Sequence, residues 1–287
     1  KKLSQDLGFL VDSVHIRDNL DLGPNVYRLT IHGVVMGEAE LLPDRELAIN
    51  PGQVFGEVDG IPAKDPSFGL DALWIDPSNR ESAQTAGYTV VDCSTVVATH
   101  LSQILKNNAA KLVGQDDVQQ LLDRLKQNSP KLVENLVPGV MSLADVTRVI
   151  HSLLDEGVPI RDMRTIAETL SLQRGVEKSP DETVSQVRVA LGPSIFQSVT
   201  GQANELPVMV LDPQLEQIMG NAIQNNNGVI EPNLLDTVVT GIGEGSGKME
   251  AEGASPVLLV SGAIRGFLAR LLRGRMANFY ILAYDEI

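Results

Sequence analysis

The sequence has very few cysteines and aromatic residues. Its 287 residues include one cysteine, Cys93, and aromatic side chains make up only 4% of them. A single cysteine cannot form an internal disulfide, so a reducing compartment is expected. With so few aromatics, the cores must be built from Leu, Val, Ile and Ala, and a hydrophobic content of 43% is ample for that.

Positive charge is also scarce, and long apolar runs are missing. The chain has 23 Lys and Arg residues against 37 Asp and Glu residues, a formal net charge of −14. Nucleic acids and anionic membrane surfaces attract basic faces, so neither is an expected partner. No apolar run is long enough to span a bilayer, and no signal peptide opens the chain. The composition predicts a soluble body that meets other proteins.

The motifs of common enzyme chemistry are missing as well. The glycine-rich segment Gly241–Met249 fails as a phosphate-binding loop, because Ile242 stands where the first glycine belongs and Met249 replaces the magnesium-binding hydroxyl. We expect a mobile connection there instead. No serine lies in a nucleophile-elbow pentad, and Cys93 is expected to be a small apolar residue between a strand and a helix. The histidines show no metal-ligand spacing: His15, His32, His100 and His151. We therefore expect no enzyme activity, no cofactor and no metal.

The strongest local pattern is a buried strand that leads directly into a helix, over Thr89–Leu105. The first residues are β-branched and apolar without alternation, which is typical of a strand buried on both faces. Ser94 follows as a possible helix N-cap. The helix then carries one apolar stripe at helical spacing, namely Val97, Leu101, Ile104 and Leu105. The opposite face is either solvated, which these residues alone favour, or the wall of a recognition cleft: Thr99, His100 and Gln103.

The order of the predicted elements divides the chain into four parts. Residues 1–43 and 93–112 form the first part, and residues 44–92 form a second part inserted into it, both of mixed α/β structure. Residues 113–192 form a helical third part. Residues 193–287 form an α/β fourth part, a small sheet with crossover helices. The predicted fold class is therefore α+β and multidomain.

Some local predictions can be compared directly with a structure. Asn25–Leu41 is predicted to be a hairpin that turns at His32-Gly33, and Pro51–Ser67 an irregular excursion. A further strand is predicted over Val11, Val14 and Ile16. Four arginines recur along and just after the predicted helix Gly262–Arg273, where a solvated face is the default and a contact for an acidic partner the alternative: Arg265, Arg270, Arg273 and Arg275.

Several stretches resemble the cytoplasmic domain of the FlhA family of bacterial flagellar export-gate proteins. They run from one end of the chain to the other: Ala48–Gly52, Asp65–Leu70, Trp74-Ile75, Ser94–Leu101, Leu136–Gly139, Leu154–Ile166 and Pro256–Val260. The homologous family of virulence-type secretion is similar, and the flagellar branch is preferred. The resemblance implies a non-enzymatic docking platform for protein export.

The resemblance also has consequences for the whole protein. It implies four subdomains, a membrane-spanning half ahead of Lys1, a short tail after Ile287, and a nine-membered ring at the cytoplasmic face of the inner membrane. The chain begins without a methionine and ends directly after a predicted strand, so we expect a piece of a longer protein. The implied partners are export chaperones carrying late substrates, components of the export ATPase complex, an FlhB-type gate protein and further copies of the chain.

Within that family, chaperones dock in a cleft between the first two subdomains. The matching positions here are Asp65, Phe68 and Thr99, with Pro51 and Phe55 nearby. One aromatic anchor among polar groups is how protein-binding sites concentrate their energy. The alternatives are an enzyme built on the α/β fourth part and a purely structural ring subunit.

Two glycines at predicted part boundaries, Gly114 and Gly192, are candidate hinges. Glycine absorbs backbone changes that other residues resist, and interfaces between parts of this size are usually modest. We therefore expect open and closed forms that differ by a rotation of residues 193–287, with chaperone binding favouring the open form. The alternative is a rigid body in which these glycines only end helices.

Overall fold

The computed structural model describes residues 2–173, 175, 179–201, 205–225, 230–276 and 279–287. It is a mixed structure of helices and strands, as the predicted fold class requires. The chain separates into two compact units. The N-terminal unit comprises residues 10–112 with the first four residues, and the C-terminal unit comprises residues 5–9 and 113–287. The first helix, α1 (Lys2–Leu7), has residues in both.

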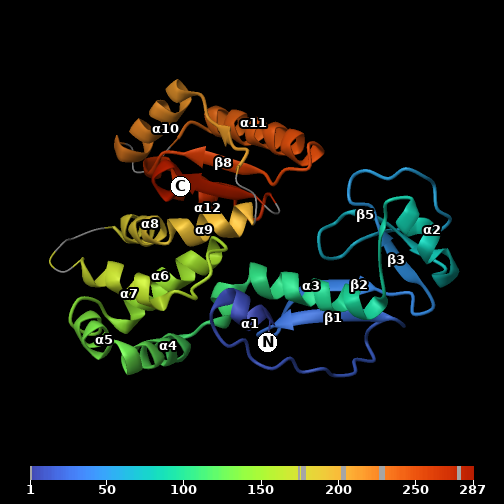
Figure 1. The fold of residues 1–287 in the computed structure, drawn as a ribbon, viewed down its shortest axis with the longest axis horizontal. Helices are drawn as coiled ribbons and strands as arrows, with labels where there is room; N and C mark the ends of the chain where they lie inside the picture. The colour runs from blue at the N-terminus through green and yellow to red at the C-terminus, as the bar shows by residue number, and fades with distance from the viewer. Residues whose placement is uncertain (1, 174, 176–178, 202–204, 226–229, 277–278) are drawn as a thin grey trace. The chain divides into compact units, whose positions relative to one another are not determined.

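The N-terminal unit begins with the predicted hairpin. Strands β1 (Val26–Ile31) and β2 (Val34–Glu40) pair in antiparallel fashion. His32 and Gly33 between them have φ angles of 50° and 80°, the left-handed pair that a tight hairpin turn requires. Helix α3 (Cys93–Asn107) runs beside the hairpin (Figure 1). The hairpin prediction is confirmed. The sequence alone could reveal the hairpin, because the residues that determine it are consecutive.

Gly37 of β2 lies so close to α3 that a methyl group can be added only if side chains of the helix shift. A Cβ there would be 2.6 Å from Ile104 Cδ1 and 2.7 Å from His100 Nε2. We expect Gly37→Ala to destabilise the N-terminal unit by about 1–3 kcal/mol through overpacking. Denaturant unfolding followed by the fluorescence of Trp74, the only tryptophan, measures this unit. Gly23→Ala is the matched control, since its Cβ meets nothing nearer than 3.5 Å. Equal stability of the two variants would contradict the prediction.

A four-stranded antiparallel sheet forms the rest of the unit, in the order β4-β5-β3-β6. Its buried side chains Leu47, Ala72 and Trp74 pack against Val96 of α3. The 3-10 turn η1 (Pro77–Asn79) and the helix α2 (Arg80–Thr85) precede the last strand, and the 3-10 turn η2 (Ala109–Leu112) follows α3. The strands are β3 (Glu46–Ile49), β4 (Ile61–Lys64), β5 (Asp71–Ile75) and β6 (Thr89–Val91).

Two predictions for this unit are wrong. Residues 61–64 form an edge strand within the segment that was expected to be irregular, since Pro62 is tolerated at an edge, where its missing N–H is not needed. The strand predicted over residues 11–16 is absent from the described chain, and apolar side chains there are exposed. A few apolar β-branched residues do not make a strand when no neighbouring strand pairs with them.

The first part of the C-terminal unit is helical, as predicted. Ser142 and Asp162 cap two of its helices by accepting backbone N–H groups of the first turn. The helices follow one another with short connections: α4 (Gln115–Asn128), α5 (Pro130–Leu136), α6 (Leu143–Asp155), α7 (Met163–Ser171), α8 (Pro180–Ala190) and α9 (Gly192–Thr200).

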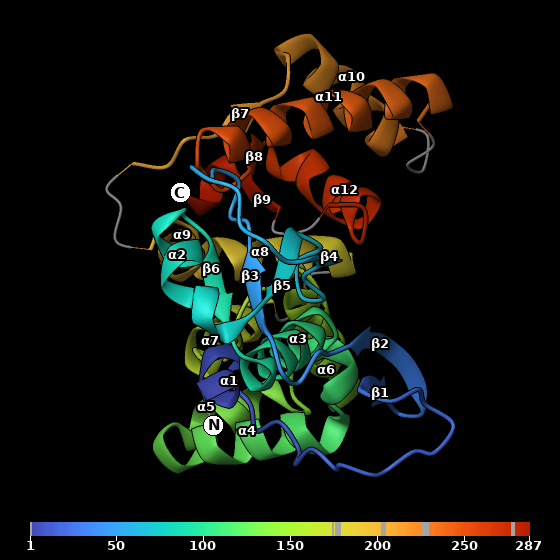
Figure 2. The ribbon, with the colours of Figure 1, turned by 90° about the vertical axis from the view of Figure 1, so that its right-hand side faces the viewer.

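A parallel three-stranded sheet with crossover helices forms the second part, again as predicted. Its order is β7 (Met209–Val210), β8 (Val257–Val260) and β9 (Tyr280–Ala283), followed by the 3-10 turn η3 (Tyr284–Glu286). Helices α10 (Pro213–Asn225) and α11 (Pro232–Ala251) connect β7 to β8, and α12 (Gly262–Leu272) connects β8 to β9. In Figures 1 and 2, α12 lies between the sheet and α8, with α11 beyond the other side of the sheet.

The glycine-rich segment Gly241–Met249 is helical, not a mobile connection. It forms the second half of α11, where Val238, Ile242 and Ser246 are buried at four-residue spacing. Gly245 brings the helix within van der Waals range of Met209 in β7. The burial of this stripe outweighs the low helix propensity of glycine, about 1 kcal/mol per residue.

No helix among the described residues is long and apolar enough to cross a bilayer. The boundary between the two compact units falls between Leu112 and Val113, where the predicted helical third part begins. The finer division into four parts stays a prediction.

Candidate functional site

Three loops gather at one end of the four-stranded sheet. The register pairs Lys64 with Asp71 and Ile49 with both Ala72 and Thr89. The loops that follow β3 and β4, and the loop that precedes β6, therefore leave the sheet at the same edge. Pro51 and Phe55 lie in the first of these loops, and Asp65 and Phe68 in the second, so the strand pairing brings four of the five predicted docking residues to one end of the sheet.

Asp65 organises the loop that carries Phe68. The Asp65 carboxylate accepts the Phe68 N–H at 2.7 Å, and its backbone oxygen accepts the Gly69 N–H at 2.8 Å. Its own N–H donates to the oxygen of Leu70 at 2.9 Å. Gly69 has a φ of 71°, which closes the turn at no steric cost. Asp65 is only 3% exposed, whereas Phe68 is 43% exposed. The buried carboxylate thus holds a large apolar side chain at the surface.

Thr99 and His100 of α3 do not share a solvated face, contrary to the expectation. The buried stripe of α3 is Val96, His100 and Ile104, so His100 points into the unit and Thr99 is half-buried. The Tyr27 hydroxyl lies 2.7 Å from His100 Nδ1, and the two rings meet edge to face. Spacing of four residues from Val96 to His100 to Ile104 is the signal that would have placed His100 inside.

Electrostatics connects Asp65 to this pair. Burial raises the pKa of Tyr27 to about 12, with a further contribution from the charge of Asp65. Burial lowers the pKa of His100, although the charge of Asp65 acts in the opposite direction. Neutral His100 and the protonated Tyr27 hydroxyl therefore share one hydrogen bond at Nδ1, whose direction is set by the tautomer of the ring. Asp65, Tyr27 and His100 are thus electrostatically coupled, a relation that the sequence did not reveal.

The buried histidine makes a pH dependence expected. The folded pKa of His100 lies below its ordinary value of 6.5, so above pH 6.5 it is neutral in both folded and unfolded chains. As the pH falls below 6.5 the unfolded chain binds the proton first, and the N-terminal unit loses stability. Unfolding followed by Trp74 fluorescence measures this, with His100→Gln and Tyr27→Phe as comparisons. Parent and His100→Gln curves that stay parallel from pH 7.5 to 5.5 would contradict the prediction.

Pro51 and Phe55 occupy a more exposed position. Phe55 is 85% exposed, and its backbone N–H donates to Ala86 at the end of α2 at 2.8 Å. The loop passes close to Gly87, where a Cβ would be 3.2 Å from the Gln53 oxygen, so a glycine leaves room for it. The side chain of Phe55 is thus free of the hydrogen-bonded framework that holds Phe68. Among the described residues, no group of His, Cys, Asp and Glu is placed to hold a metal ion.

The two predicted hinge glycines differ in their surroundings. Gly114 caps α4 with extended backbone, and its N–H donates to the Asp117 carboxylate at 2.8 Å. It lies beside the boundary between the two compact units. Gly192 is buried at the start of α9, where a Cβ would be 2.6 Å from the Glu286 oxygen. Gly192 therefore serves close packing inside the C-terminal unit.

Comparisons with known proteins agree with the resemblance in the sequence. The FHIPEP family matches residues 1–287. The flagellar biosynthesis protein FlhA of Escherichia coli strain K12 is 46% identical over all 287 residues, and the FlhA of Salmonella typhimurium is also 46% identical. The chain spans 41% of the length of each of these relatives.

Solved structures share the fold of the entire chain. The CdsV protein of Chlamydia pneumoniae superposes with a TM-score of 0.86 at 21% identity, covering 100% of this chain and 83% of that one. CdsV is also known in a complex with the CdsO protein. Nonameric SctV-C of EPEC superposes with a TM-score of 0.80 at 18% identity, covering 100% of this chain and 87% of that one. At these identities the likeness is one of fold.

Proposed function

This chain belongs to the FHIPEP family, and from that premise we propose that it is the docking part of a flagellar export gate. It binds export chaperones together with their late substrates, and components of the export ATPase complex and an FlhB-type gate protein are further partners. In this proposal the chain binds its partners and rearranges its own parts, and it catalyses no reaction. The full-length protein resides in the bacterial inner membrane with this part on the cytoplasmic face.

The observation that carries the docking proposal is the presentation of Phe68. A large aromatic side chain that is 43% exposed normally has little reason to be held in one place. Here, three hydrogen bonds through Asp65 fix the loop beneath it. A rigid aromatic anchor loses little conformational entropy on binding, which is the property that interface hot spots share. Thr99, half-buried on α3, is proposed to border the same site.

The flagellar branch is favoured over virulence-type secretion. Identity to the FlhA proteins of Escherichia coli and Salmonella typhimurium is 46%, more than twice the 21% identity to CdsV, which shares the fold. The nonameric neighbour supports a ring of nine copies as the assembled state of this chain. The alternative function is a ring subunit without a docking role. Binding of a chaperone–substrate complex distinguishes the two functions.

Calorimetry of the 287-residue chain with a flagellar chaperone–substrate complex tests the proposal. We expect saturable binding at one site per chain, weaker for the chaperone without its substrate. Absence of binding, with the chain folded, would leave the structural ring subunit. A parallel titration with ATP tests the enzyme alternative, for which saturable nucleotide binding would be the supporting result.

A further inference from the structure

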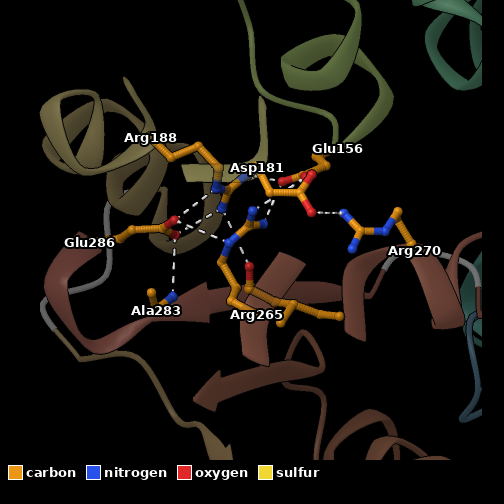
Figure 3. Close-up of polar contacts among 8 residues, drawn as sticks. Glu156, Asp181, Arg188, Arg265, Arg270, Ala283 and Glu286 are labelled. Carbon is orange, nitrogen blue, oxygen red and sulfur yellow. Dashed lines mark hydrogen bonds and ion pairs between the residues drawn. The ribbon is translucent and has the colours of Figure 1, made fainter. Parts of the chain in front are cut away.

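Four charged side chains form a closed ring inside the C-terminal unit (Figure 3). Glu156, Arg188, Glu286 and Arg265 alternate in sign around it, and each contacts the two beside it. The side chains of the two arginines and Glu286 are at most 3% exposed, and that of Glu156 is 20% exposed. Buried charges are tolerated only where they are paired, and this ring pairs every one of its members.

The ring joins two parts of the chain that are distant in sequence. The helical part (residues 113–192) supplies Glu156, at the end of α6, and Arg188, on the buried face of α8. The α/β part (residues 193–287) supplies Arg265, on the buried face of α12, and Glu286, in η3. Each part thus contributes one acid and one base. The default expectation that Arg265 lies on a solvated face is wrong, because its side chain is only 2% exposed and pairs with acids of the same chain.

The strongest contacts of the ring cross between the two parts. Arg188 donates through Nε and Nη2 to the two carboxylate oxygens of Glu286, at 2.7 and 2.8 Å. Both guanidinium NH₂ groups of Arg265 donate to Glu156, Nη2 at 3.3 Å. Inside the helical part, Arg188 Nη1 donates to Glu156 at 2.9 Å, whereas inside the α/β part Arg265 Nε lies 3.7 Å from Glu286.

Arg188 and Glu286 also form hydrogen bonds with the backbone of the last strand, β9. Its Nη2 donates to the Ile281 oxygen in β9 at 3.3 Å, and Glu286 accepts the Ala283 N–H at 3.3 Å. Burial lowers the pKa of Arg188, but the hydrogen bonds and charges of Glu286 and Glu156 outweigh burial and hold it above its ordinary value. The arginine therefore stays charged, and the ring persists throughout the range in which its carboxylates are ionised.

We propose that this ring locks the helical part and the α/β part into one body, so that residues 113–287 move together. A small rotation between the parts would break the crossing pairs while the side chains were still buried, and unpaired buried charge is strongly unfavourable. Arrangements in which the two parts are slightly rotated but still in contact are thereby excluded. Gly192 packs against Glu286 inside this body, so motion of the α/β part is carried by the Gly114 junction instead. The proposal does not depend on the docking function.

Two exposed ion pairs at the C-terminal end of α12 provide matched controls. Arg270 pairs with Asp181 at 2.8 Å, and Arg273 pairs with Asp155, so both also join the two parts. The two arginine side chains are 58% and 51% exposed. Exposed pairs of this kind contribute little and are screened by salt, unlike the buried ring. Arg270→Gln therefore removes the same charge from the same helix without touching the ring.

The test measures the distance between the two parts in the full 287-residue chain. Cysteines replace the exposed Gln127 of α4 and Glu244 of α11 in a Cys93→Ala background, and carry spin labels. We expect one narrow distance distribution in the parent and in Arg270→Gln, unchanged in high salt. Arg265→Met is expected to broaden it. Amide exchange in β8 and β9 should rise on the order of 100-fold in Arg265→Met and no more than a few-fold in Arg270→Gln.

A charge-balanced variant separates the lock from simple loss of folding. Glu156→Gln with Arg265→Met leaves the neutral pair of Arg188 and Glu286, so it should be more stable than either single variant. A parent distribution that is broad or has two peaks would overturn the proposal. So would a folded Arg265→Met chain whose distances and exchange match those of Arg270→Gln. Where a variant does not fold, the width of the parent's distance distribution still tests whether the two parts form one body.

Discussion

Replacing Phe68 with alanine is expected to weaken the binding of chaperone–substrate complexes by about 30-fold or more, the loss of roughly 2 kcal/mol typical of a central anchor. Phe68 is 43% exposed and lies outside the buried core, so the fold should be retained when its ring is removed. Calorimetry measures the affinity, and Trp74 fluorescence confirms that the N-terminal unit is folded. The ring of charges in the C-terminal unit should be unaffected.

Val34→Ala is the matched control for this variant. Val34 lies in the hairpin of the same unit and is 57% exposed, but it is not among the predicted docking residues. Its truncation should change the affinity less than threefold. If Phe68→Ala binds as tightly as the parent, the docking site lies elsewhere, whether or not the chain binds chaperones.

Replacing Asp65 is expected to act through the loop and not through direct contact. Asp65 is 3% exposed and its carboxylate holds the Phe68 N–H, so a partner cannot reach it without displacing the loop. Asp65→Ala leaves that N–H unpaired and should cost about 1.5–3 kcal/mol of stability in addition to weakening the binding. Asp65→Asn keeps an oxygen that can accept the same N–H, so it should recover most of the binding.

The two variants of Asp65 distinguish a positioning role from a contact. Exchange of the Phe68 amide, measured without any partner, should be fast in Asp65→Ala and slow in Asp65→Asn. A partner that binds the negative charge itself would instead discriminate against both variants equally. Equal loss of affinity in the two, with slow amide exchange in Asp65→Asn, would therefore refute the positioning role while preserving the docking site.

Local signals in the sequence were enough for most of the secondary structure. The turn at His32-Gly33, the Ser142 cap and the three parallel strands with their crossover helices are each encoded within a few neighbouring residues. The same local signals failed at residues 11–16 and at Gly241–Met249. In both segments the outcome depends on what packs alongside, which neighbouring residues do not encode. The resemblance to an export-gate family also rests on local runs of residues.

By itself, the sequence determined the family, the kinds of elements and the candidate docking residues Asp65 and Phe68. Only the tertiary structure decided that Phe68 is exposed at the surface and that Asp65 is buried. It also turned His100 inward toward Tyr27, which lies 73 positions away. The ring of charges was beyond sequence reasoning for the same reason, since its crossing pairs join residues 98 and 109 positions apart. Helical spacing indicates that arginines share a face, but the charge that meets that face is set by how distant segments pack.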